Sequence, residues 1–275
     1  MPRSPIHKVL STFRRHGVRA LLMGGQACVL YGAAEFTRDS DFCVAADGDN
    51  LRRLRAALAE LRARRTFVPA LGAAVLARGH ACHFVCTTPE LHAWRIDVMA
   101  RLRGCDQFEV LWARRRQARL PGLGTVDVLN IRDLVRAKKT QRDKDWPMIA
   151  RLVVADYLAA GARPPRERVE FWLREARSPQ LLLELVRRFR GTAQRLAAER
   201  VALAAALRAD TAAIEQALDS EQRRERLADR AFWRPLRDEL RRIWRGGRTR
   251  RNRTYGRRRV AAASRSDSAT GGRER

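Results

Sequence analysis

Two short stretches carry the strongest fold signal in this 275-residue chain: MGGQA at residues 23–27 and TRDSDF at residues 37–42. The apolar run Val18–Met23 before the glycines is typical of a buried β-strand, and Gln26–Tyr31 can then begin a helix. The run Asp41–Ala46 is typical of a second strand. Together they predict a strand, a glycine turn, a helix and a second strand that opens with aspartates.

Helical and strand patterns continue through the first 150 residues. Leucines spaced three or four residues apart over residues 51–61 predict an amphipathic helix. Further strands are predicted over Cys82–Thr87, Trp94–Leu102 and Val126–Leu129, and a helix over Arg132–Lys139. We therefore expect an α/β fold, with a small mixed sheet flanked by helices.

Composition divides the chain into three parts. Residues 1–155 are predicted to form the α/β domain. Residues 156–245 lack strand patterns and are rich in Leu, Ala and Arg, which is typical of a helical domain. Residues 246–275 combine many Arg with Gly, Ser and Thr, and we expect this basic tail to be disordered alone. A nucleic-acid-binding arm and a merely solvated terminus account for the tail equally well.

The charge balance indicates the kind of partner. With 57 Lys and Arg against 30 Asp and Glu, the net charge is +27, which predicts attraction to polyanions such as RNA or nucleotide phosphates. The apolar run Ala20–Ala34 is too short to span a bilayer, and residues 1–17 do not resemble a signal peptide. Five cysteines in apolar stretches favour a reducing compartment. We expect a cytoplasmic protein without membrane contact.

Asp39 and Asp41 are the first candidate functional residues. Side chains alternate across a strand, so residues two apart point to one face. Two carboxylates at such a short distance repel each other, and a cation between them removes this repulsion. Mg²⁺ takes carboxylate oxygens together with water and substrate phosphate. The pair therefore predicts half of a site for a metal–triphosphate complex, although an ordinary Asp-rich turn is the alternative.

Asp97 offers a third carboxylate, since it lies on the polar face of the predicted strand Trp94–Leu102. If that strand neighbours the one with Asp39 and Asp41, the three acids converge. Three acids can hold two Mg²⁺ ions about 4 Å apart, the arrangement for in-line displacement at phosphorus. The alternative is that Asp97 simply pairs with Arg95 or Arg101.

Three further features have two interpretations. Gly24 and Gly25 allow close approach of backbone to phosphate, although most such pairs are turns. In residues 37–38, Arg and Thr have phosphate-binding side chains, or the threonine merely caps the turn. The stretch His80–Cys86 contains metal-capable side chains, but alternation puts His83 on the face opposite the cysteines. We interpret it as a strand with inert cysteines.

In their order along the chain, these motifs resemble the DNA polymerase beta-type nucleotidyltransferase superfamily, in its small bacterial form. The stretch DLVRAKKTQRDKD at residues 133–145 resembles the segment that follows the catalytic domain in abortive-infection and toxin–antitoxin nucleotidyltransferases. The resemblance covers roughly residues 15–155. It implies a nucleotidyltransferase sheet in which Asp39 and Asp41 bind metal and Asp97 binds metal and acts as general base.

The same resemblance implies two Mg²⁺ ions as cofactors and an NTP as a partner. Gly24 and Gly25 would cradle the triphosphate. Basic side chains expected near the nucleotide are Arg38, Lys138, Lys139, Arg142 and Lys144.

The expected function is Mg²⁺-dependent transfer of a nucleoside monophosphate from an NTP to a hydroxyl, with release of pyrophosphate. The net charge favours an RNA acceptor such as tRNA, recruited by the basic C-terminal region. A hydroxyl of a cognate toxin or antitoxin protein is the next candidate. An aminoglycoside is disfavoured, because an acidic surface binds a cationic drug better. The alternative is a non-catalytic nucleic-acid- or partner-binding module, antitoxin-like, that retains the fold.

Overall fold

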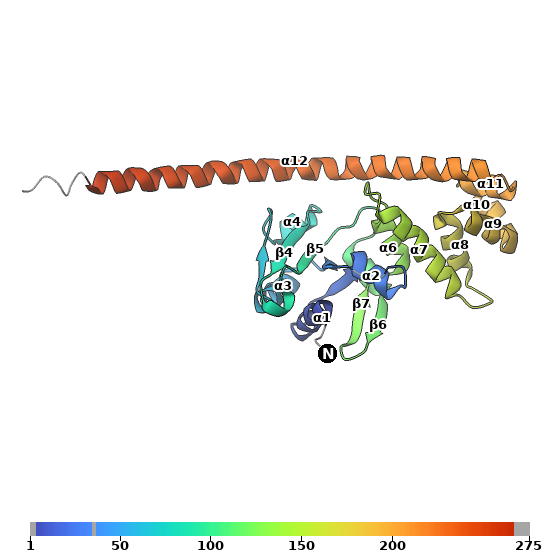
Figure 1. Cartoon of the computed structure of the whole chain (residues 1–275), viewed down its shortest axis with the longest axis horizontal. Coiled ribbons are helices and arrows are strands. Elements are labelled where there is room, and N and C mark those ends of the chain that lie inside the picture. The colour runs from blue at the N-terminus through green and yellow to red at the C-terminus, as the bar shows by residue number, and fades with distance from the viewer. Residues whose placement is uncertain (1–3, 35–36, 267–275) are drawn as a thin grey trace, which may run out of the picture. The chain divides into compact units, whose positions relative to one another are not determined.

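A computed structural model describes residues 4–34 and 37–266, with side chains described up to residue 245. The described chain falls into two compact units, one ending at Trp233 and the next beginning at Arg234. The first unit contains the α/β region and a helical region (Figure 1).

A seven-stranded mixed sheet, in the order β3-β4-β5-β2-β1-β7-β6, forms the α/β region. Its strands are β1 (Ala20–Met23), β2 (Asp39–Val44), β3 (Ala63–Arg65), β4 (Cys82–Cys86), β5 (Arg95–Met99), β6 (Arg116–Leu120) and β7 (Gly124–Val128). β2 pairs in parallel with β5 and antiparallel with β1. The predicted α/β class and mixed sheet are therefore confirmed.

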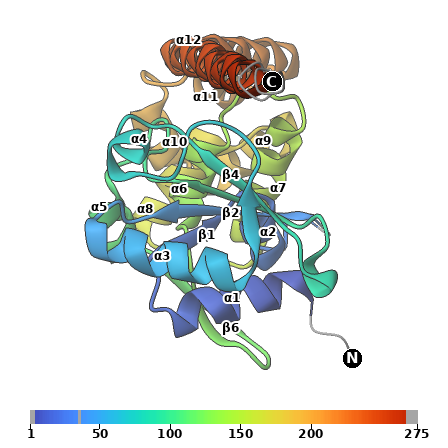
Figure 2. The same cartoon turned by 90° about the vertical axis from the view of Figure 1, so that its left-hand side faces the viewer.

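Helices α1 (Pro5–Arg15) and α3 (Gly48–Glu60) lie side by side on one face of the sheet (Figure 2). Phe42 of β2 packs on this side, with its ring centroid 4.7 Å from that of Phe13. Because side chains alternate along a strand, Asp41 points to the opposite face. The face bearing Asp41 is therefore the one that α1 and α3 leave uncovered.

The remaining helices of the α/β region are short: α2 (Gly24–Leu30), α4 (Ala73–Ala77), the 3₁₀ turn η1 (Pro89–Leu91), α5 (Phe108–Ala113) and α6 (Ile131–Ala137). α2 follows β1 directly, as the glycine turn predicts. Two strands escaped prediction, because β3 is three residues long and β6, with the sequence RQARL, buries only Ala118. Pairing with β4 and β7 makes them strands.

The helical region comprises α7 (Asp145–Leu158), α8 (Arg166–Glu175), α9 (Pro179–Arg188), α10 (Arg190–Leu196), α11 (Val201–Leu207) and the beginning of α12 (Thr211–Ser266). Trp172 is fully buried, with its ring 5.1 Å from Tyr157 and 6.1 Å from Phe189. Residues 151–245 contain no strand, as predicted. Within residues 4–34 and 37–266, no helix combines the length and apolarity needed to cross a bilayer.

Helix α12 passes through residue 246, where the sequence predicts a disordered tail. It continues to Ser266, while residues 267–275 lie outside the described part of the chain. The predicted boundary therefore falls inside a helix.

Candidate active site on the open face of the sheet

Three polar side chains share one row across neighbouring strands. Asp97 of β5 is in register with Asp41 of β2 on one side and with His83 of β4 on the other. Neighbouring strands lie about 4.8 Å apart, and residues in register point to the same face. Asp39 is in register with Arg95, so this pair lies next to the row on the same face. The structure thus brings all three predicted carboxylates together.

Asp41 lies in an unfavourable environment for a negative charge. The pKa of Asp41 is raised from 3.8 to about 6, first by burial and then by the neighbouring charges of Asp39 and Asp97. Lys138 and Arg142 act in the opposite direction. The carboxylates are therefore close enough to repel one another, and the nearby cations only partly relieve the repulsion.

Asp97 has one satisfied and one unsatisfied carboxylate oxygen. The residue is only 8% exposed, and Arg95 donates a hydrogen bond to its Oδ2 at 3.2 Å. Its Oδ1 is buried and lies 2.8 Å from Nδ1 of His83. The two atoms are not aligned for hydrogen bonding, so each lacks a hydrogen-bond partner. Pairing of Asp97 with Arg95 thus accounts for Oδ2 and leaves Oδ1 available.

The glycine turn is required by close packing against these residues. Gly24 has a φ of +66°, and a Cβ atom there would lie 1.8 Å from Oδ2 of Asp41. A Cβ on Gly25 would lie 2.9 Å from the side chain of Thr37. Thr37 in turn donates a hydrogen bond from its hydroxyl to the Asp39 carboxylate. The absent Cβ atoms therefore let the turn lie directly against the aspartate strand.

Asp145, at the start of α7, binds the basic side chains that lie near Asp41. Nζ of Lys138 lies 3.2 Å from its Oδ1, Nε of Arg142 lies 2.8 Å from its Oδ2, and the Thr140 hydroxyl lies 2.5 Å from its Oδ2. Burial alone would raise the pKa of Asp145, but these three partners outweigh burial and lower it. Asp145 therefore remains ionised and holds Lys138 and Arg142 near Asp41.

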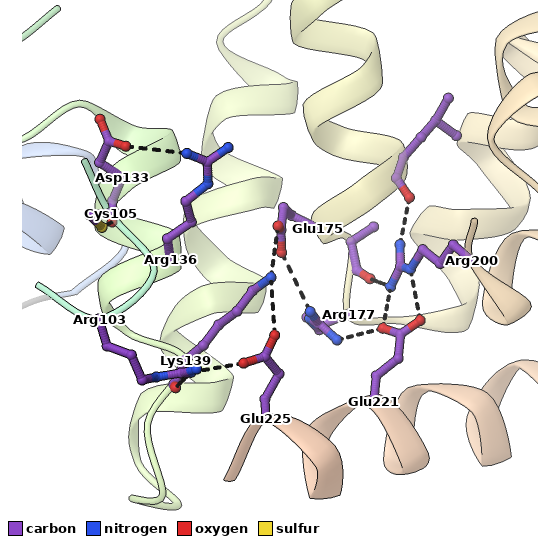
Figure 3. A network of polar contacts seen from close by, with 12 residues as sticks. Arg103, Cys105, Asp133, Arg136, Lys139, Glu175, Arg177, Arg200, Glu221 and Glu225 are labelled. Carbon is purple, nitrogen blue, oxygen red and sulfur yellow. Dashed lines mark hydrogen bonds and ion pairs between the residues drawn. The ribbon is translucent and has the colours of Figure 1, made fainter. Parts of the chain in front are cut away.

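The other predicted basic residues have different locations. Lys139 points into an ion-pair network of the helical region, where Nζ lies 2.9 Å from Glu175 (Figure 3). Arg38 and Lys144 are exposed. Of the five predicted basic residues, Lys138 and Arg142 are among the main influences on the pKa of Asp41, and both lower it.

No three His, Cys, Asp or Glu side chains among the described residues are gathered tightly enough to hold a metal ion by themselves. Mg²⁺ does not need such a cage, because it is usually bound by one or two carboxylates together with water and substrate phosphates. The like-charged acids and the unpartnered Oδ1 of Asp97 fit a cation of this kind. The donor set thus suits a cation that arrives together with a phosphate ligand.

Two site residues were missed by sequence analysis. His83 was correctly placed on the face opposite the cysteines, but antiparallel pairing of β4 with β5 was needed to bring it beside Asp97. Asp145 was part of the motif that carried the family resemblance, yet the motif alone does not show that it holds Lys138 and Arg142.

No protein-family model and no curated protein matches this chain. Among solved structures, the solution structure of the antibiotic-resistance factor ANT(2'')-Ia is similar at a TM-score of 0.32 and 16% sequence identity. The similarity covers 77% of this chain and 94% of that one. At this TM-score the similarity does not bear on function.

Proposed function

We propose that this chain is a nucleotidyltransferase that moves a nucleoside monophosphate from an NTP to a hydroxyl. The main support for this proposal is the row of acids on the open face of the sheet. Asp41 and Asp97 are in register there, and Asp39 is near enough to raise the pKa of Asp41. Acidic groups held together against repulsion indicate a ligand that supplies positive charge. The motif order resembles the polymerase beta-type superfamily and supports the same reaction.

Asp39, Asp41 and Asp97 would hold Mg²⁺, which arrives with the triphosphate. When bound, the metal supplies positive charge to the transferring phosphoryl group and to the pyrophosphate. Lys138 and Arg142, fixed by Asp145, extend this positive charge beside Asp41. Most of the rate enhancement would come from positioning and electrostatic stabilisation.

The reaction forms one P–O bond and breaks another. The acceptor oxygen bonds to the α-phosphorus, and the bond from that phosphorus to the bridging oxygen of pyrophosphate breaks. Asp97 is the carboxylate proposed to take the hydroxyl proton. The electron pair of the broken bond leaves with pyrophosphate.

A polyanionic acceptor fits the net charge of +27. RNA, such as tRNA, is the acceptor we propose, and a hydroxyl of a toxin or antitoxin partner is the other outcome of the test. Four α-³²P-labelled NTPs are incubated separately with the chain, Mg²⁺, total RNA and cell lysate. Label in one RNA or protein band identifies the donor and the acceptor together.

The matched variant is the double substitution Asp39→Ala and Asp41→Ala. We expect it to abolish labelling while RNA binding stays equal or becomes tighter, because two negative charges are removed. Unchanged labelling by the double variant would refute the nucleotidyltransferase proposal. RNA binding without labelling by any NTP, in the presence or absence of Mg²⁺, would support the non-catalytic module instead.

A further inference from the structure

The pair formed by His83 and Asp97 is not explained by the carboxylate site alone. We propose that His83 is a nitrogen ligand of the metal bound by Asp97, so that the site prefers a first-row transition ion such as Mn²⁺ to Mg²⁺. This inference rests on the proposed function, because it concerns the metal held by the same carboxylates.

The first support is the unsatisfied state of both atoms. Nδ1 of His83 and Oδ1 of Asp97 are both buried, and neither has a hydrogen-bond partner. A buried polar atom without a partner is destabilising, and native proteins rarely retain one without a reason. A cation that accepts one lone pair from each atom satisfies both at once.

The second support is the spacing of the two atoms. They lie 2.8 Å apart. Neighbouring ligand atoms of an octahedral ion with bonds of about 2.1 Å are roughly 3 Å apart. The imidazole and the carboxylate oxygen are thus already at the spacing of two ligands of one ion, without the alignment of an ordinary His–Asp hydrogen bond.

The third support is that strand pairing fixes both donors. His83 and Asp97 are paired in register in the antiparallel ladder between β4 and β5. Phe67 packs edge-on against the imidazole, with the ring centroids 6.1 Å apart. Since no three His, Cys, Asp or Glu side chains among the described residues hold an ion by themselves, phosphate oxygens and water would complete the set.

The donor chemistry determines the metal preference. Carboxylate, phosphate and water suit Mg²⁺, whereas imidazole favours transition ions over Mg²⁺. Mn²⁺ binds the carboxylate, phosphate and water oxygens as Mg²⁺ does. The imidazole nitrogen would strengthen the binding of Mn²⁺ more than that of Mg²⁺.

The test uses the full chain, Mn²⁺ and inorganic triphosphate, which avoids any assumption about the base. Mn²⁺ affinity is measured by titration, and pulsed electron paramagnetic resonance detects nitrogen coupled to the bound ion. We expect a nitrogen signal in the wild type and its loss in His83→Ala, together with at least about a tenfold weaker Mn²⁺ affinity. Mg²⁺ affinity should change less.

His92→Ala is the matched control, because it removes an exposed imidazole from the loop before β5. It should keep both the signal and the affinity, and circular dichroism checks that each variant is folded. Equal or tighter Mn²⁺ binding by folded His83→Ala, without a nitrogen signal in the wild type, means that His83 only pairs with Asp97. Absence of any metal binding in the wild type would overturn the proposed function as well.

Discussion

Charged side chains meet opposite environments in two regions of the first unit. In the helical region, Arg200 is 8% exposed yet donates to both Glu221 oxygens at 3.0 Å and to the carbonyls of Leu173 and Ala176 at 2.6 and 2.7 Å (Figure 3). On the open face of the sheet, the charges of Asp39 and Asp97 act against ionisation of Asp41, and Oδ1 of Asp97 has no hydrogen-bond partner.

This difference in environment distinguishes charged residues that stabilise the fold from charged residues that are available to bind a ligand. A buried ion whose donors all find acceptors holds elements together, and it has no remaining capacity for a ligand. Acids that repel each other reduce stability, so their retention indicates a ligand that relieves the repulsion. Both regions are rich in charge, but the helical network pairs each acid with a basic side chain, whereas the acids of the sheet face repel one another.

Breaking the helical network should have the largest effect on stability. Arg200→Ala leaves Glu221 buried without its main partner, and we expect the free energy of unfolding to fall by about 3–5 kcal/mol. Arg174→Ala is the control, since its pair with Glu199 is about half exposed and contributes less than about 1 kcal/mol. Urea titration of both variants provides the comparison, and similar losses would contradict it.

Asp41→Asn should instead increase stability. The pKa of Asp41 is raised to about 6 in the folded chain, so the folded state binds more protons and the carboxylate becomes destabilising as pH rises from about 4 to 6. The variant should gain roughly 3 kcal/mol above pH 6 and nothing below pH 4. Asp49→Asn, at an exposed pair with Arg52, should show no such pH dependence in urea titrations.

Gly24→Ala tests the contact between the glycine turn and Asp41. Gly32 has a similar positive φ of +73° but open space around it, so Gly32→Ala carries only backbone strain of about 1 kcal/mol. Gly24→Ala adds the clash with Asp41, and we expect a loss of about 2 kcal/mol. Calorimetric unfolding measures both. Equal losses would show that Asp41 moves aside without penalty.

Lys138 and Lys139 are adjacent in sequence but belong to the two different regions. Lys138→Met should reduce nucleotidyl transfer about tenfold, because it removes positive charge beside Asp41. Lys139→Met should leave transfer within about threefold, because its partner is Glu175 in the helical network. Labelling rates at saturating NTP measure the difference, and a greater loss in Lys139→Met would contradict the division.

The fold was largely predictable where apolar periodicity is strong. The predicted helix over residues 51–61 corresponds to α3, because its leucines pack against the sheet. Strands β1, β2, β4 and β5 were found for the same reason. β3 and β6 were missed because their strand structure comes from pairing rather than from their own sequences.

The candidate site was only partly predictable. The spacing of Asp39 and Asp41 indicates one face, because alternation is a local property of a strand. The assignment of Lys139 to the nucleotide remains a prediction, although its side chain contacts Glu175, because motif position does not fix side-chain direction.

The spacing of the aspartates, the glycine turn and the excess of positive charge are thus visible in the sequence alone. Tertiary structure alone decided that Asp97 lies between Asp41 and His83, because β5 is inserted between β2 and β4. Such neighbours are set by strand order, which depends on how the whole sheet buries its apolar side chains.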